Sequence, residues 1–133
     1  MSLKAFGVVV VAMIVAIGGG WFWGASGKSA LSAERRAAVE RATIAEARGA
    51  LLNARLSVIA SNFGDAARDL EAARGLASDL QSRLREVGQP ERAGHVQIVL
   101  THIREAERLT AALDRGAADA AAKAAETLAA VGK

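Results

Sequence analysis

The side chains best suited to chemistry in this sequence are two histidines that sit in a helical pattern. His95 and His102 stand seven residues apart, so they share one face of a helix, and Glu105 follows His102 by three residues. Histidine pairs that bind zinc from one helix usually stand four apart, or three apart for a histidine and a carboxylate, and a site needs a third ligand. Glu105 is off the line that joins the histidines. We therefore interpret both histidines as surface or boundary residues.

Pairs of acidic residues also occur, at Asp65 and Asp69 and at Glu105 and Glu107. The neighbouring sequence predicts no pocket around them, which favours charges on helix surfaces over an acid–base pair. No order of Ser, His and Asp indicates a nucleophilic triad. The chain contains no cysteine, which excludes thiol chemistry and zinc–thiolate sites. We expect a protein that is not an enzyme and that needs no metal and no cofactor.

The charge pattern argues against a nucleic-acid partner. Lys and Arg number 17 against 14 Asp and Glu, which leaves a net charge of +3. The two signs alternate along the chain, whereas nucleic-acid binding needs a basic patch on one face, with aromatic residues where single strands are bound. A mixed-charge helix surface in water explains the composition.

A charge-free apolar run at residues 6–23 predicts a transmembrane anchor after a short tail at residues 1–5. As a helix the run would reach roughly 27 Å, close to the roughly 30 Å hydrocarbon core of a bilayer. The residues expected to contact lipid or the membrane interface are Phe6, Val10, Ile14, Trp21, Phe22 and Trp23. The lipid bilayer is thus the first predicted partner.

The same N-terminus resembles a signal peptide, with Lys4 before the apolar run and small residues at 25–27 where cleavage could occur. Retention is favoured because the run continues into aromatic residues that suit the membrane interface. Lys4 favours a cytoplasmic N-terminus, and hence a domain on the periplasmic or outer side of the inner cell membrane. Lys28 and the arginines after it favour the opposite side. We expect the outer side, with the other placement left open.

Residues 24–31 are predicted to form a linker, and residues 32–133 a single helical domain. Its sequence is rich in Ala, Arg and Glu and nearly free of aromatic residues, which indicates closely packed helices and not a sheet. Asn62 is expected to cap the second helix, Gly88 to end it, and Pro90 to begin the third. The predicted class is all-α, with an antiparallel bundle of about four helices after the anchor.

Each of the four helices has apolar residues that recur every three or four positions on one face. In residues 32–61 the predicted inner face is Ala45, Gly49, Leu52, Leu56 and Ile59. After Asn62 it is Ala66, Leu70, Ala73, Ala77, Leu80, Leu84 and Val87. In residues 91–115 it is Val96, Val99, Ile103, Ala106 and Leu113, with Thr110 as its weak step. In residues 117–131 it is Ala121, Ala124, Leu128 and Val131.

The first two helices are predicted to form a hairpin that carries the domain. Its predicted core is Leu52, Leu56, Ile59, Phe63, Ala66, Leu70, Ala73, Leu80 and Leu84. Ala54, Phe63, Ala66, Leu70 and Ala73 have the spacing of a tetratricopeptide repeat, so residues 50–78 resemble one such helical hairpin. Ser78 stands where that family usually has proline. The resemblance implies two helical hairpins and a role in docking other proteins.

These features predict a non-catalytic, single-pass membrane protein that acts as a helical adaptor, a scaffold or an accessory subunit of a membrane-associated assembly. The anchor would concentrate the domain near its protein partner, which the sequence does not identify. One alternative is an envelope spacer that self-associates like a coiled coil, so that the chain forms a homo-oligomer. A carrier of small ligands is disfavoured, because no deep aromatic or polar pocket is predicted.

Overall fold

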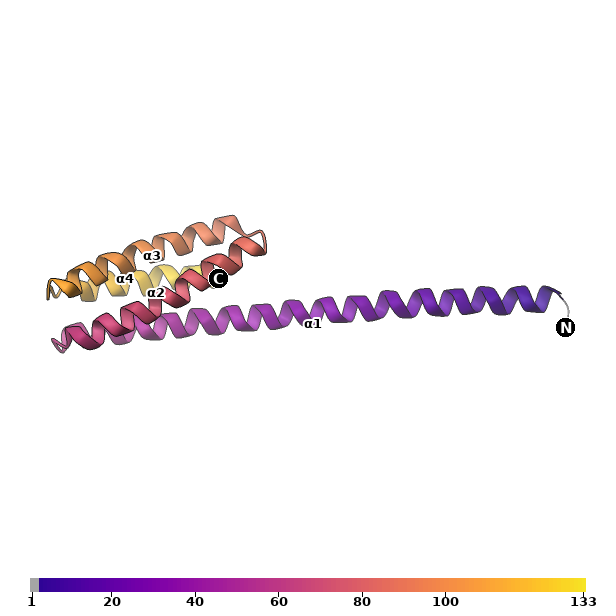
Figure 1. The fold of residues 1–133 in the computed structure, drawn as a ribbon, viewed down its shortest axis with the longest axis horizontal. Coiled ribbons are helices and arrows are strands. Elements are labelled where there is room, and N and C mark those ends of the chain that lie inside the picture. The colour runs from indigo at the N-terminus through magenta and orange to yellow at the C-terminus, as the bar shows by residue number, and fades with distance from the viewer. Residues whose placement is uncertain (1–2) are drawn as a thin grey trace. The chain divides into compact units, whose positions relative to one another are not determined.

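Every secondary-structure element in the described part of the chain is an α-helix. The computed structural model describes the backbone of residues 3–133 and the side chains of residues 29–133. The helices are α1 (Leu3–Ile59), α2 (Phe63–Glu86), α3 (Pro90–Ala111) and α4 (Ala117–Val131) (Figure 1). The predicted all-α class is therefore confirmed over this range.

Helix α1 passes without a break through residues 24–31, which the sequence predicts as a linker. This stretch contains no proline, and most of its residues are Ala, Ser, Lys and Leu, which a helix accommodates. The contacts divide the chain into two units, Met1–Ala38 and Val39–Lys133. The compact helical unit thus begins seven residues after the predicted start at residue 32.

The predicted membrane anchor at residues 6–23 lies outside the residues whose side chains are described. Its proposed lipid-facing and interfacial residues fall there as well: Phe6, Val10, Ile14, Trp21, Phe22 and Trp23. Among the residues whose side chains the structure describes, no helix is both long enough and apolar enough to cross a membrane. The anchor stays a prediction from the sequence.

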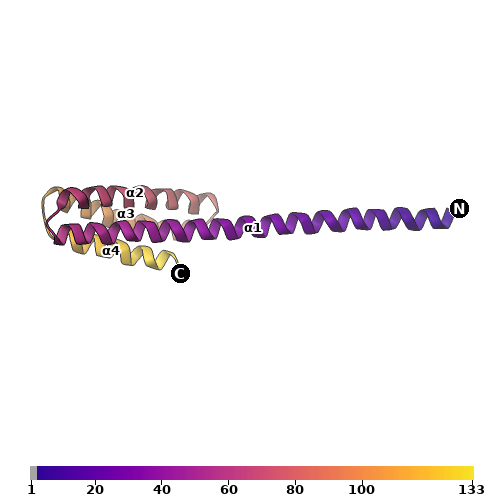
Figure 2. The same cartoon turned by 90° about the horizontal axis from the view of Figure 1, so that it is seen from below.

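The unit Val39–Lys133 is an antiparallel bundle formed by the end of α1 together with α2, α3 and α4. Each helix reverses the direction of the one before it (Figures 1 and 2). The turns are short, at residues 60–62, 87–89 and 112–116. Short turns make successive helices antiparallel neighbours, which is the usual arrangement of an up-and-down helical bundle.

Local sequence accounts for where α2 begins and ends. The Asn62 side chain accepts a hydrogen bond from the backbone N–H of Asp65 at 3.2 Å, which satisfies one of the free donors at the start of α2. Gly88 follows the C-cap with a φ of +73°, a conformation that side chains disfavour. Pro90 then occupies the first turn of α3, where its missing N–H costs nothing. The three predicted helix signals occur where expected.

The bundle core is built largely from alanine. Of the 25 buried apolar residues, 13 are alanine, which allows the helix backbones to approach closely. The largest fully buried side chains are Leu51, Leu70, Leu80, Leu84, Ile103, Leu128, Val58, Val96 and Val99. The predicted inner faces of α2 and α4 lie in this core, apart from Val87. Val87 is exposed because it is the C-cap residue of α2.

The predicted inner face of α1 is wrong. Ala45, Gly49, Leu52, Leu56 and Ile59 are all exposed. The buried positions of α1 are Ile44, Ala47, Leu51, Ala54 and Val58. This helix carries two apolar stripes with the same three-and-four spacing, displaced by one or two residues, and the stripe that contains Ala47 and Ala54 faces the bundle. Ala54 presents only a methyl group to the core, whereas Leu56, the residue of the other stripe at that level, would need more room between the helices.

The predicted inner face of α3 is wrong at its C-terminal end. Leu113 is exposed and lies beyond α3 in the left-handed region, with a φ of +56°. Thr110, predicted as a weak step, is buried instead. The helix ends at Ala111, and the Asp114 side chain accepts a hydrogen bond from the N–H of Gly116 at 2.8 Å. That turn carries Leu113 away from the core.

A small second cluster holds the ends of the helices together. Val58, Ala66, Ala117 and Ala118 are buried here, and Phe63 packs half-buried against them. The cluster joins the α1–α2 turn to the α3–α4 turn. Phe63, predicted as part of the hairpin core, therefore lies in this second cluster rather than in the main one.

Two long polar side chains connect helices that are distant in sequence. Arg92 of α3 pairs with Glu40 of α1, and its Nη2 donates a hydrogen bond to the backbone carbonyl of Val131 at 2.7 Å. Gln81 of α2 is buried and donates through Nε2 to the carbonyl of Ala93 at 3.2 Å and to Gln97 Oε1 at 2.9 Å. Because these bonds need one geometry, they fix how α1, α2 and α4 are rotated against α3.

The facing of α3 can be tested with two isoleucines of the same helix. Ile103 is fully buried, whereas Ile98 is 48% exposed. Ile103→Ala should lower the free energy of unfolding by about 2–5 kcal/mol through lost burial and a cavity, and Ile98→Ala by about 1 kcal/mol or less. Unfolding of the full chain in mild detergent, followed by circular dichroism, measures both. Equal losses would contradict the facing assigned to α3.

The contribution of Arg92 can be compared with that of an arginine that pairs only within its own helix. Arg92→Met should lower the free energy of unfolding by about 1–3 kcal/mol, because Glu40 and the Val131 carbonyl lose a charged donor. Arg68→Met removes an exposed pair with Asp65 and should cost about 0.5 kcal/mol or less. The same unfolding assay applies. If the Arg92 variant is no weaker than the Arg68 variant, Arg92 does not hold the helices together.

Candidate docking surface

The structure does not bring the histidines and acidic residues together into a reactive site. His95 is exposed and His102 is half-buried on α3. Glu105 accepts hydrogen bonds from Arg108 at 2.9 and 2.6 Å. These bonds hold the pKa of Glu105 below its usual value and raise the pKa of Arg108. Glu105 is therefore an ionised surface carboxylate at neutral pH, which suits neither proton donation nor general acid catalysis.

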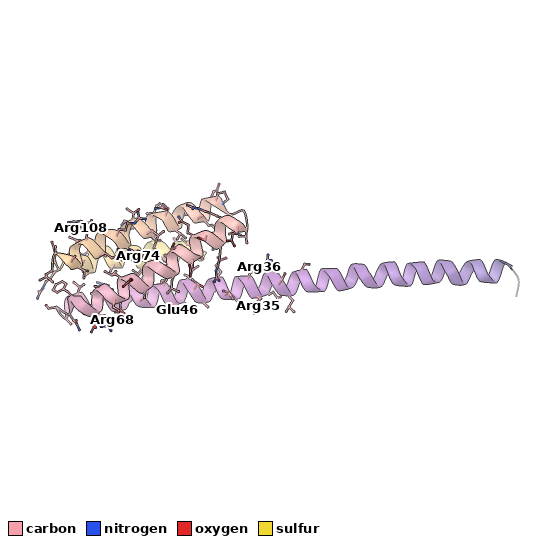
Figure 3. The ribbon with its side chains drawn as sticks, in the orientation of Figure 1. Arg35, Arg36, Glu46, Arg68, Arg74 and Arg108 are labelled. Atoms are coloured by element: carbon pink, nitrogen blue, oxygen red, sulfur yellow. The ribbon has the colours of Figure 1, made fainter. Side chains whose placement is uncertain are left out.

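Asp65 and Glu107, from the two acidic pairs noted in the sequence, also form ion pairs with arginines. Asp65 lies 2.5 Å from Arg68 within α2, and Glu107 of α3 lies 3.5 Å from Arg74 of α2. Figure 3 labels Arg68, Arg74 and Arg108 on these helices. Over residues 29–133, no three side chains from His, Cys, Asp and Glu are placed to hold a metal ion. These acidic side chains therefore form ion pairs on the surface of one helix or between α2 and α3.

Two adjoining grooves run between α2 and α3. One has a volume of about 510 Å³ and the other of about 540 Å³, and Glu71 and Arg74 line both. The first is also lined by Phe63, Gly64, Ala67, Glu107, Thr110, Ala111 and Leu113. The second is also lined by Gly75, Ser78, Gln81, Gln97, Leu100 and Arg104. Neither groove includes a histidine, and Phe63 is the sole aromatic side chain in their linings.

The most distinctive surface of the unit Val39–Lys133 is the outer face of α1, which we name the α1 ridge. It consists of Ala42, Ala45, Gly49, Leu52, Leu56 and Ile59, and all six are exposed. Leu52, Leu56 and Ile59 are 42%, 62% and 58% exposed. At 3.6 residues per turn, the ridge lies about 150° round the helix from the buried stripe. Figure 2 shows α2 and α4 on either side of this part of α1, so they leave that face uncovered.

The ridge differs from the other exposed apolar residues of the unit. Val39, Val87, Ile98 and Leu113 occur singly and not on successive turns of one face, which is ordinary for a protein surface. Leu52, Leu56 and Ile59 stand on successive turns of one face. A Cβ added at Gly49 would meet nothing within 4 Å, so the small half of the ridge is open as well. A contiguous exposed apolar strip of this kind is typical of a docking surface.

The sequence pattern identified five of the six ridge residues, all except Ala42, but assigned them to the core. The sequence does show that α1 has more apolar positions than one buried face can use, which indicates that one stripe is exposed but not which one. Charged and polar residues lie along the two edges of the ridge. Arg41, Arg48 and Arg55 follow one edge at seven-residue intervals, and Glu46 and Asn53 follow the other (Glu46 is labelled in Figure 3).

Comparison of the chain with protein-family models, with curated proteins and with solved structures finds no match. The likeness of residues 50–78 to a tetratricopeptide hairpin therefore rests on the spacing of its own residues. The class that the described residues define is an all-α helical bundle with one exposed apolar ridge.

The groove that is lined by Phe63 and Thr110 includes a buried hydroxyl whose role can be tested. Thr110 Oγ1 is buried and has no hydrogen-bond partner. Thr110→Val replaces that hydroxyl with a methyl group and should raise the free energy of unfolding by about 1 kcal/mol. Thr101→Val on the same helix is the control, because its exposed hydroxyl donates to the Gln97 carbonyl at 3.0 Å. Destabilisation by Thr110→Val would mean that the hydroxyl binds a water or ligand in this groove.

Proposed function

We propose that the chain is a non-catalytic, single-pass membrane protein whose helical domain serves as an adaptor, a scaffold or an accessory subunit. The observation that carries this proposal is the α1 ridge, since an adaptor needs a docking surface and this strip of large apolar side chains is exposed. The ion-paired carboxylates support a role without catalysis.

The membrane part of the proposal rests on the sequence of residues 6–23. Their charge-free apolar character and the aromatic residues at their end are typical of an anchor in the inner cell membrane. Lys4 supports a domain on the periplasmic or outer side. The tetratricopeptide-like spacing in the α1–α2 hairpin supports two helical hairpins that dock a protein partner. The alternating charges support a partner that is not a nucleic acid.

Fractionation of cells that express the full chain tests the anchor. We expect the chain in the membrane pellet after an alkaline wash, because a transmembrane helix resists extraction, and a variant that lacks residues 1–27 in the soluble fraction. A phosphatase fused after Lys133 should be active if the domain lies outside the cytoplasm. Release of the full-length chain by the alkaline wash would contradict the anchor. A shortened chain in the soluble fraction would indicate a cleaved signal peptide.

A further inference from the structure

We infer that the α1 ridge is the seam of a parallel coiled coil formed with a second copy of this chain. The inference rests on the proposed function in one respect, the shared direction that a common membrane gives the two copies. It deepens that function by naming the first partner that the ridge binds.

The ridge has the spacing of a coiled-coil seam. Its six positions follow one another by three, four, three, four and three residues, without a break from Ala42 to Ile59. This is the heptad spacing that keeps one apolar seam against a partner helix. In the sequence the same register continues backwards to Ala38, and the next seam position is the charged Arg35. The buried stripe of α1 is on the other side of the helix. The α1 helix of a second copy can therefore approach the ridge without a clash with α2, α3 or α4 of the first copy.

The charges beside the ridge select a parallel pair. In a parallel coiled coil each edge of one seam meets the opposite edge of the other. Arg41 of one copy then faces Glu46 of the second copy, and Arg48 faces Asn53. In an antiparallel pair the edge with three arginines would meet itself, and like charges repel. The edges are thus complementary to a second copy in the parallel orientation.

The sizes of the ridge residues are also compatible with this pairing. In register, Ala42, Ala45 and Gly49 meet their equivalents, so the two helices can approach closely at that half. Leu52, Leu56 and Ile59 meet as layers of large side chains at the other half. Two copies anchored by residues 6–23 in one membrane would also point the same way. The heptad spacing of the ridge, the charges along its edges and the shared orientation in the membrane therefore all favour a second copy of the chain as the partner.

Single cysteines provide the test, because the natural chain has none. Full chains with Ala42→Cys or Leu56→Cys are oxidised in intact cells, quenched, and separated without reductant. Both positions lie on the seam and face themselves in a parallel pair, so each variant should give a covalent dimer. Ser82→Cys, on the exposed side of α2, is the control for random collision and should give none.

Other occupants would give different patterns, and each would overturn the inference. An antiparallel pair that overlaps the whole ridge would place Ala42 opposite Ile59, so it would link Ala42→Cys to Ile59→Cys when the two are expressed together. It would leave Ala42→Cys and Leu56→Cys, each expressed alone, as monomers. A different protein on the ridge would give a conjugate whose mass is not twice that of the chain. No conjugate at either position, or as much at Ser82→Cys, would mean that no second copy occupies the ridge.

Second substitutions in the Ala42→Cys chain distinguish the contribution of the apolar seam to dimer formation from that of its charged edges. Leu56→Glu should lower the yield of dimer by about tenfold or more, because it places a carboxylate in the apolar seam, while Ile98→Glu, at a comparably exposed isoleucine of α3, should not. Glu46→Arg should lower the yield about threefold, and adding Arg41→Glu should restore it. Circular dichroism checks that each variant stays folded. Unchanged yields in either series would overturn the parallel seam.

The two proposals can fail separately in one experiment. Dividing the oxidised sample into membrane and soluble fractions reports the anchor, and the covalent dimer reports the seam. A membrane-bound monomer would overturn the seam and leave the anchor intact. A soluble dimer would overturn the anchor and leave the seam intact.

Discussion

The close approach of the helices in an alanine-rich core is the constraint on which the rest of this structure depends. With alanine at 13 of 25 buried apolar positions, the bundle gains little area from each residue and must bring the backbones near one another. Large side chains fit inside only where the facing helix supplies small ones. That constraint decides which residues of each helix face inward, and it leaves the surplus of large apolar residues on the surface.

Polar contacts supply the specificity that so uniform a core lacks. Alanine faces can slide or rotate past one another with little change in buried area, whereas hydrogen bonds to charged or amide groups require one geometry. Gln81 joins α2 to two residues of α3, and Arg92 joins α3 to Glu40 of α1 and to the end of α4. These side chains define the rotation of helices whose apolar contacts alone would tolerate others.

The accuracy of prediction from sequence varied with the number of apolar stripes in a helix. The stripe of α2 was predictable through Leu84 because the helix has one apolar face and clear signals at Asn62, Gly88 and Pro90. Helix α1 has two competing stripes of similar total side-chain size, and their spacing gave no information about how closely α2 and α4 would approach either one. On α3, Leu113 was misplaced because the turn at Asp114 depends on a local hydrogen bond that periodicity does not encode. The docking surface was not predicted either, because the exposure of Leu52, Leu56 and Ile59 depends on how the helices pack in the folded bundle.

The outward position of the α1 ridge follows from the core and from one ion pair together. Rotating α1 to bury Leu52, Leu56 and Ile59 would place the larger Leu56 near the level where Ala54 now meets neighbouring helices, and the alanine contacts around it would open. Glu40 stands on the same side of the helix as Ile44, Ala47 and Leu51. Its pairing with Arg92 would be lost in that rotation, which would leave a half-buried arginine without its carboxylate. The bundle therefore stabilises the arrangement in which the ridge faces outward, before any partner binds to it.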